Sequence, residues 1–398
     1  MKKISVIFAA TLFLLTVVTT TTYALTPKRW TFLIYVNGNN HLDLWGAANI
    51  KSMEKMGSND QVNIVVQWAS ESANKAVRLL VQKSTNPKRV TSPILQDLGL
   101  VDMGDYHSLE DFIAWGVTNF PADHYFIDVW DHGSGWHANS HQLHTGRVVG
   151  DISHDDISGH EITTPQLGQV MDYAARLIGH KVDIYGSDAC LMGAIEIAAE
   201  MSNSVRYYIG SQEEEPGAGW PYADLLSRWE KIHNANAAQI AKIVVDAYVK
   251  SYENGSNGSS EVTMSAYDLN KLAGFYQAIK KLGTDIRRLN KNDKTKIIDA
   301  AKNAIHFNDA DDLIDFLKRL MASDVAINPQ DIANGVTAVN DLVILNEDTQ
   351  QYKNATGLSI WFPVDSKTYD TYAARYQNLI FNVNTQWNET LKSLFFPS

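Results

Sequence analysis

The sequence predicts an α/β protein, a three-layer α/β/α sandwich with a mostly parallel sheet, followed by a smaller and mainly helical region. Short apolar runs rich in β-branched and aromatic residues alternate with helical patterns over the first 252 residues. A polar segment rich in Gly, Ser and Asn follows at 253–260, and helical patterns predominate beyond it. The chain of 398 residues is also longer than one compact core usually holds.

The predicted strands of the first region are bounded by Gly, Asn or Ser. They are 31–36, 63–68, 77–82, 125–130, 182–187 and 206–210. The predicted helices between them are 42–56, 109–119, 165–178 and 191–201. In parallel sheets, chemistry gathers just past the carboxyl ends of the strands, so the residues that follow each strand are the first candidates for a site.

The second region has helical spacing at most positions. Helices are predicted at 269–289, 294–304, 311–321 and 329–345, with one strand at 358–362. We therefore divide the chain into a main domain at 25–252, a polar connector at 253–260 and a C-terminal, mainly helical region at 261–398.

The first 24 residues have the pattern of a signal peptide. Lys2 and Lys3 precede an apolar core at 7–18, and a small-residue end follows at 22–24. A permanent membrane anchor is the alternative, but the apolar core is short for a span and no later stretch is apolar enough to cross a bilayer. We expect an exported protein, periplasmic or extracellular, without stable membrane insertion after the signal is removed.

The charge of the chain narrows its partners. The formal net charge is -11, and it becomes -13 once Lys2 and Lys3 are removed. So acidic a chain lacks the basic surface that binds nucleic acid. It is compatible with an acidic pocket for a basic group.

Cys190 is the only cysteine, so it cannot close a disulfide within the chain and is either packed and inert or reactive. Its position favours reactivity, because it follows the strand 182–187 and precedes the helical pattern 191–201. A thiol beside a helix amino terminus is expected to favour the thiolate, which is the form that attacks.

His132 stands in the same kind of position, directly after the strand 125–130 and before Gly133. If the two strands are neighbours, His132 can take the proton of Cys190 and later give one to a leaving amine. Gly133 lets the backbone approach a substrate, and the N–H groups of Gly133 and Cys190 could hold an oxyanion. A loop histidine and a packed thiol are the alternatives for each residue alone, but the pair after separate strands favours a catalytic dyad.

The sequence also resembles the clostripain-like cysteine peptidases, whose fold is shared with caspases, legumains and gingipains. The resemblance covers nearly the whole mature chain. It lies in WTFLIYVNGNNHLD (30–43), WDHGSGW (130–136), DDISGHEITTPQL (155–167), GSDACLMGAIE (186–196), GSQEEEPGAGWPY (210–222), DDLIDF (311–316) and GLSIWFP (357–363). The most specific part is the order and spacing of the histidine and cysteine motifs.

The resemblance implies a caspase-like fold and hydrolysis of peptides or proteins by His132 and Cys190, with a preference for Arg or Lys before the scissile bond. It implies that Asp188 lies in the pocket for that side chain, where a recessed carboxylate pairs with a cation. Glu213 and Trp220 are further candidates for substrate binding. No cofactor is required for the chemistry, although the resemblance makes calcium a candidate structural or activating ion.

One position departs from the pattern of the relatives. They often have an acidic residue between the two glycines of the segment 216–221, where this chain has Ala218. The acidic run 213–215 lies just upstream and could compensate, or it could be a solvated loop. Peptidase activity is therefore the firmer expectation, and strict Arg or Lys specificity stays open.

Relatives are often made as zymogens and cut between the histidine and cysteine motifs. The polar stretch 137–150 is loop-like and contains Arg147, so we expect self-cleavage after Arg147, with an ordinary surface arginine as the alternative.

Two other classes of function compete with a cysteine peptidase. One is a non-catalytic protein of the same fold that binds basic peptides in an acidic cleft. The other is a metal-dependent hydrolase that uses the histidines near the same stretch, although no HExxH motif or cysteine pair supports zinc. Acidic loops such as 151–156 could supply oxygen ligands to calcium, but the sequence names no metal ligands and indicates no oligomeric state.

Overall fold

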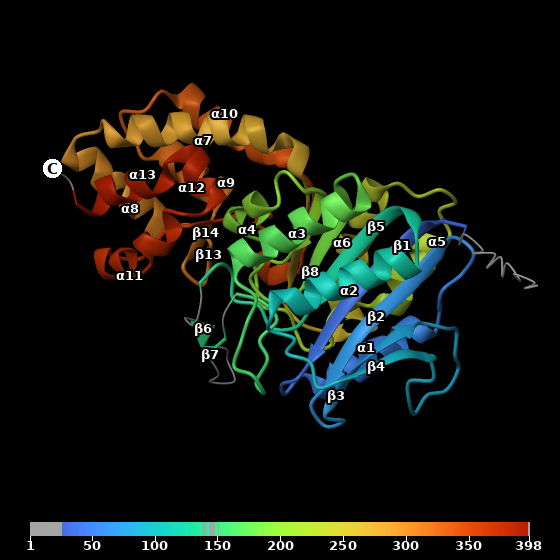
Figure 1. The fold of residues 1–398 in the computed structure, drawn as a ribbon. Helices are drawn as coiled ribbons and strands as arrows, with labels where there is room; N and C mark the ends of the chain where they lie inside the picture. The colour runs from blue at the N-terminus through green and yellow to red at the C-terminus, as the bar shows by residue number, and fades with distance from the viewer. Residues whose placement is uncertain (1–25, 138–140, 143–147, 150, 397–398) are drawn as a thin grey trace, which may run out of the picture.

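A computed structural model describes residues 26–137, 141–142, 148–149 and 151–396, and its central feature is one large sheet (Figure 1). Within the described residues the sheet has nine strands in the order β15-β12-β9-β8-β5-β1-β2-β3-β4. They are β1 (Lys28–Gly38), β2 (Val62–Ser70), β3 (Lys75–Leu80), β4 (Ile94–Gly99), β5 (Ala122–Trp130), β8 (Val182–Asp188), β9 (Val205–Gly210), β12 (Thr263–Asp268) and β15 (Val343–Asp348). The strands from β9 to β2 are parallel and the pairs at both edges are antiparallel. The predicted α/β fold with a mostly parallel sheet is confirmed.

Helices cover both faces of this sheet and make the outer two layers. One face is covered by α2 (Tyr106–Asn119), α3 (Thr164–Ile178) and α4 (Ile195–Glu200). The opposite face is covered by α1 (Asp43–Glu54), α5 (Tyr222–Glu230) and α6 (Ala237–Tyr252). Figure 1 shows α2 and α3 lying across the near face of the sheet.

Strand β1 illustrates why the apolar runs of the sequence become central strands. Phe32 and Ile34 belong to the core under α1, α5 and α6, whereas Leu33 and Tyr35 belong to the core under α2 and α3. Successive side chains of a strand point to opposite faces, so a strand covered on both faces is apolar at nearly every position.

Helix α3 has the ends that its sequence predicts. The Thr163 side chain accepts a hydrogen bond from the N–H of Gln166, and the Gln166 side chain accepts one from the N–H of Thr163. This capping box satisfies N–H groups that the first turn leaves unpaired. The helix ends at Gly179, whose φ of +87° is the left-handed conformation that glycine adopts without strain.

The helix after the cysteine is shorter than predicted. The sequence predicts 191–201, but α4 begins at Ile195 because Leu191 has a φ of +61° and Ala194 is extended. Gly193 also lies so close to the loop after β9 that a Cβ at Gly193 would be 2.7 Å from the backbone nitrogen of Gln212. The chain therefore makes a tight turn between Cys190 and the helix.

The region after residue 260 is mainly helical, as predicted. Its helices are α7 (Leu272–Arg287), α8 (Lys291–Lys302), α9 (Leu313–Ala322), α10 (Pro329–Leu342), α11 (Ser366–Tyr376), α12 (Ile380–Thr385) and α13 (Trp387–Phe395), with short 3-10 turns at η1 (Leu269–Lys271) and η2 (Gln350–Tyr352). A small sheet consists of β13 (His306–Phe307), β14 (Ala310–Asp312) and β16 (Ser359–Trp361). Two short hairpins, β6 (His141–Gln142) with β7 (Val148–Val149) and β10 (Glu253–Gly255) with β11 (Gly258–Ser259), complete the described elements.

The large sheet continues past the expected connector. Segment 253–260 contains the β10–β11 hairpin, and β12 and β15 beyond it extend the sheet from β9. The helix predicted at 329–345 ends at Leu342 as α10, since Val343, Ile344 and Leu345 belong to β15. An apolar run of this kind fits either a helix or a strand. Segment 253–260 thus marks a change in amino-acid composition, and the sheet continues beyond it.

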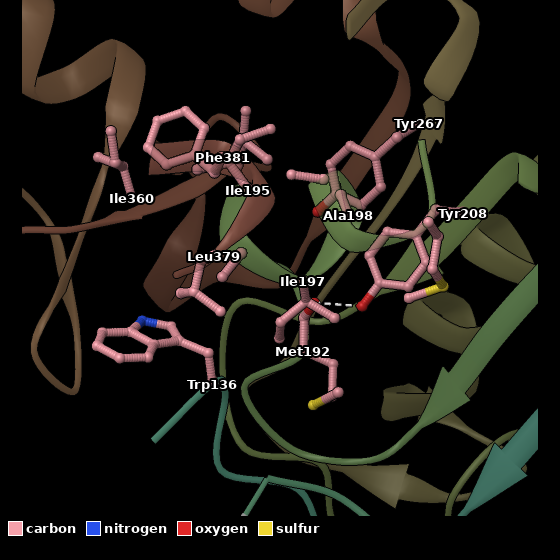
Figure 2. Close-up of a cluster of buried hydrophobic side chains, with 14 of the residues drawn as sticks. Trp136, Met192, Ile195, Ile197, Ala198, Tyr208, Tyr267, Ile360, Leu379 and Phe381 are labelled. Atoms are coloured by element: carbon pink, nitrogen blue, oxygen red, sulfur yellow. Dashed lines mark hydrogen bonds between the residues drawn. The ribbon is translucent and has the colours of Figure 1, made fainter. Parts of the chain in front are cut away.

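One apolar core joins the C-terminal region to the sheet (Figure 2). Ile195 of α4, Tyr208 of β9 and Phe381 of α12 belong to the same buried cluster. Met192 is fully buried there, and its carbonyl accepts a hydrogen bond from the hydroxyl of Tyr208. The turn that follows Cys190 is therefore held in this shared core.

Candidate active site

His132 and Cys190 follow two adjacent parallel strands at the same edge of the sheet. Trp130 of β5 is paired in register with Asp188 of β8, and the N–H of Asp131 donates to the Asp188 carbonyl at 3.3 Å. His132 and Cys190 each come two residues after this paired position. Both side chains are largely buried, 6% and 8% exposed, and both line one cavity of about 320 Å³.

Gly133 allows the histidine loop to touch the cysteine loop. A Cβ at position 133 would lie 2.5 Å from the Cys190 carbonyl oxygen and 3.1 Å from the Cβ of Ala189. Atoms that are not bonded do not approach this closely, so any side chain at 133 would push the two loops apart.

The sulfur of Cys190 is held by the loop that follows β9. The N–H of Glu215 donates to Sγ at 3.2 Å. Burial raises the pKa of the Cys190 thiol well above its usual value, and the carboxylates at 213–215 raise it further. The expectation of a helix terminus that favours the thiolate is not met, because α4 begins only at Ile195.

His132 lies against a second histidine. Its Nε2 atom is 3.3 Å from Nδ1 of His41, and the two rings stack with centroids 4.5 Å apart. The loop after β1 that carries His41 is fixed by Asp131, whose carboxylate accepts hydrogen bonds from Asn37 and Asn40 at 3.0 and 2.7 Å. Burial raises the pKa of Asp131 well above its usual value.

Asp188 lies at one side of the cavity with one oxygen anchored. Its Oδ2 accepts hydrogen bonds from the N–H of Trp220 at 3.0 Å and from the hydroxyl of Tyr222 at 2.8 Å. A Cβ at Gly219 would come within 2.9 Å of Oδ1 and 3.0 Å of Oδ2, so both oxygens lie against the chain at Gly219. Burial raises the pKa of Asp188 to about 7. The hydroxyl of Tyr222 also lies 2.7 Å from Oδ2 of Asp128, which is fully buried.

The acidic run after β9 divides between two environments. Glu214 and Glu215 line the cavity, whereas Glu213 does not and instead accepts a hydrogen bond from the hydroxyl of Tyr352 at 2.5 Å. Ala218 is also absent from the residues that line the cavity.

Trp220, expected to bind substrate, is 1% exposed, and its ring packs beneath the sheet edge against Phe126. Only its backbone N–H reaches the site, through Asp188. The aromatic walls of the cavity come from Trp45 and Trp130. Trp45 contacts Gly217, where a Cβ would lie 2.8 Å from its Nε1.

Three residues at this site were not singled out by the sequence. They are His41, Asp128 and Tyr222. His41 and Tyr222 stand inside the motifs WTFLIYVNGNNHLD and GSQEEEPGAGWPY. For Asp128 the signal is a polar residue within the apolar strand β5.

Arg147 lies outside the described residues. The C-terminal region contacts the chain on both sides of that gap. His137 pairs with Asp309 at 3.0 Å, and Arg375 pairs with Asp151. Asp151 is fully buried and also accepts a hydrogen bond from the N–H of Thr164.

The carboxylates at 151–156 do not fit a calcium site as they stand, because protein donors occupy them. Asp151 is bound by Arg375, and Asp155 accepts hydrogen bonds from Asn39 and Met103 on one oxygen and from Ile157 on the other. In the part of the chain that the structure describes, no three His, Cys, Asp or Glu side chains are grouped as metal ligands.

The chain matches one family model and the fold of several solved structures. The model of the clostripain family, peptidase C11, matches residues 34–394. The chain belongs to the clostripain family. Clostripain from Hathewaya histolytica is 24% identical to this clostripain-family chain over 315 residues. The aligned region covers 68% of this chain and 59% of that relative.

Two solved structures share the fold of this clostripain-family chain. A secreted C11 cysteine protease from Bacteroides thetaiotaomicron, in complex with an irreversible peptide inhibitor, has a TM-score of 0.67 and 20% identity, covering 90% of this chain and 99% of that one. An inactive zymogen C11 protease from Parabacteroides distasonis has a TM-score of 0.66 and 16% identity, covering 91% and 99%. At these identities the likeness shows the fold alone.

Within the described residues, no helix is long and apolar enough to span a membrane.

Proposed function

We propose that this chain is an exported cysteine endopeptidase that cuts peptide bonds after Arg or Lys. The observation that carries the proposal is the shared edge of β5 and β8, where His132, Cys190 and Asp188 line one cavity. Membership of the clostripain family supports the class of reaction. The similarity to solved proteases described as secreted, one of them with a peptide inhibitor, supports export and a peptide substrate.

The chemistry begins with transfer of the Cys190 proton to His132. The thiolate attacks the carbon of the substrate carbonyl group, and the oxygen of that carbonyl becomes an oxyanion. The N–H groups of Gly133 and Cys190 stabilise that charge. Gly133 and Ile152 form an isolated β-bridge, in which the N–H of Ser134 donates to the Asp151 carbonyl and the N–H of Ser153 donates to the His132 carbonyl. The N–H of Gly133 takes no part in this bridge, which supports its role in binding the oxyanion. His132 then gives its proton to the leaving amine, and water hydrolyses the acyl-enzyme with His132 as base.

Asp188 supplies the preference for a basic side chain. Trp220 and Tyr222 hold Oδ2, and Oδ1 has no such donor among the described residues, while the absence of a side chain at Gly219 leaves space in front of both oxygens. A guanidinium or ammonium group that enters would pair with a buried carboxylate, whereas a neutral side chain would leave that charge without a partner. The faces of Trp45 and Trp130 suit the stem and plane of an arginine.

We also propose that the protein activates itself by cleavage after Arg147. The similarity to a zymogen supports an inactive precursor. Contacts of the C-terminal region with His137 and Asp151 support a two-chain product that stays together after the cut.

A fluorogenic peptide panel tests the function. Peptides with Arg, Lys or a neutral residue before the cleaved bond are compared on the wild-type protein and on Cys190→Ala. Turnover of the basic peptides by wild type alone is expected. No turnover by processed wild type would favour the non-catalytic peptide-binding protein, and turnover that survives in Cys190→Ala would remove Cys190 as nucleophile. Equal turnover of basic and neutral peptides would count only against Asp188.

A further inference from the structure

Glu215 touches the nucleophile with its backbone and the specificity pocket with its side chain. Its N–H donates to Sγ of Cys190 at 3.2 Å, and its carbonyl oxygen lies 3.7 Å from the same sulfur. Its carboxyl group is turned toward Asp188, and both residues line the cavity. One residue therefore contacts both functional parts of the site.

The carboxyl group of Glu215 is buried against the carboxyl group of Asp188 and the hydroxyl of Tyr248. Both of its oxygens are inaccessible to solvent, and among the described residues neither has a hydrogen bond. The hydroxyl of Tyr248 lies beside it and is also inaccessible to solvent. A buried carboxyl group without hydrogen bonds is unfavourable by a few kcal/mol, so this arrangement is suited to an occupant that supplies donors.

A proton count removes Asp128, and not Asp188, from the acids that can meet a cation. The hydroxyl of Tyr222 lies within 2.8 Å of one oxygen of Asp128 and one of Asp188, but it has a single proton to donate. One of the two acids must donate in the other contact. Asp128 is fully buried and does not line the cavity, so it retains the proton.

We infer that Glu215 is the second carboxylate that binds a basic side chain, and that it links occupancy of the cavity to the reactivity of Cys190. The inference rests on the proposed function. It supplies the second acid that Ala218 does not provide. A guanidinium has donors on two edges and can pair with two carboxylates at once, so the geometry favours Arg over Lys.

The link to Cys190 is electrostatic. The carboxylates at 213–215 oppose ionisation of the thiol, and a cation paired with Glu215 cancels part of their field. The N–H of Glu215 remains on the sulfur, where it stabilises the thiolate that forms. The other charged or titratable groups that line the cavity are His41, Asp131, His132, Asp188 and Glu214.

The single cysteine makes the test direct, because alkylation of the protein reports Cys190 alone. The rate of carboxamidomethylation by iodoacetamide is measured by mass spectrometry with methylguanidine or with the neutral analogue N-methylurea. An opposite charge at contact distance shifts a pKa by at least about one unit, so methylguanidine should accelerate alkylation about 10-fold and N-methylurea should not. Slower alkylation with methylguanidine would overturn the link.

Variants of Glu215 separate charge from shape. Glu215→Gln should be alkylated faster than wild type without methylguanidine and should lose the acceleration. Glu215→Asp keeps the charge and should retain it. Glu200→Gln is the matched control, since the buried Glu200 accepts a hydrogen bond from the N–H of Ile380 and lies outside the cavity. Acceleration that persists unchanged in folded Glu215→Gln would contradict the inference.

The peptide panel distinguishes this inference from the proposed function. Glu215→Gln should lower kcat/KM for Arg peptides about 100-fold and raise it for neutral peptides, because the charge that opposes ionisation of Cys190 is removed. If wild type cleaves no peptide yet shows the acceleration, the proposed function fails. If Cys190 is essential but Glu215→Gln keeps both its Arg preference and its acceleration, only the inference fails.

Discussion

The imidazole of His132 stacks on that of His41, with Nε2 of His132 3.3 Å from Nδ1 of His41. The two rings come from different loops, one after β5 and the other after β1. His41 is therefore placed to orient His132, the proposed base, and does not need to react itself.

Replacing His41 should affect turnover more than substrate binding. His41→Ala removes the stacking ring and the hydrogen-bond partner, so His132 loses orientation and kcat should fall by about 10- to 100-fold with little change in KM. Steady-state kinetics on an Arg peptide measure the split. His41→Asn, which restores a polar partner, should recover part of the loss, and a large rise in KM with unchanged kcat would assign His41 to binding.

Gly133→Ala should abolish activity because the new Cβ would lie 2.5 Å from the Cys190 carbonyl. The two loops would move apart to relieve this contact, and the resulting misplacement of His132 and Cys190 should lower kcat/KM by at least about 100-fold. Gly274→Ala is the matched control, since nothing lies within 4 Å of a Cβ there. A fully active Gly133→Ala would show that the loops adapt without loss.

The stability of the protein should fall as the pH rises through the range in which Asp188 ionises only in the unfolded chain. Burial raises its folded pKa to about 7, from about 4 in the unfolded chain. Between these values the folded state holds a proton that the unfolded state has released, so raising the pH favours unfolding.

Asp188→Asn removes this loss, because the amide oxygen still accepts from Trp220 and Tyr222. The variant should gain about 4 kcal/mol of unfolding free energy near pH 8 and none near pH 4, while losing its preference for basic peptides. Denaturant unfolding at the two pH values measures it. Asp97→Asn is the control, since hydrogen bonding to Lys75 lowers the pKa of Asp97. An equal gain at both pH values would contradict the linkage.

Cleavage at Arg147 should leave the two chains associated. Wild type should give two bands on a denaturing gel and one species by gel filtration, and Arg147→Ala should remain a single chain. Arg375→Ala removes the partner of the buried Asp151 and should destabilise the protein by about 3 kcal/mol. If the two chains of the cleaved wild type separated on gel filtration, these contacts would not be what holds the product together.

The sequence predicted the central strands and the edge at which His132 and Cys190 meet, because buried parallel strands are apolar at nearly every position. It did not predict β12 or β15. Ser265 and Asp268 interrupt the first with polar residues, and the second continues the apolar pattern of α10. Edge strands carry weaker patterns than central ones, so sequence separates them poorly from helices and loops.

The site was predictable where chemistry depends on chain position and less so where it depends on packing. Nothing in the run 213–215 indicates that Glu213 turns toward Tyr352 and Glu215 toward Asp188, because that division follows from the C-terminal region packing over the loop. The prediction that α4 begins beside Cys190 was wrong for a local reason. Leu191 adopts a left-handed conformation, which apolar periodicity does not reveal.

The pairing of β12 with β9 has a consequence for any shortened version of the protein. A chain that stopped at residue 260 would retain His132, Cys190 and Asp188, but β9 would become an open strand edge with unpaired backbone groups. The apolar faces of Ile195 and Tyr208 would also meet water. Such an edge pairs readily with other chains, so the fragment should aggregate before it could work as an enzyme.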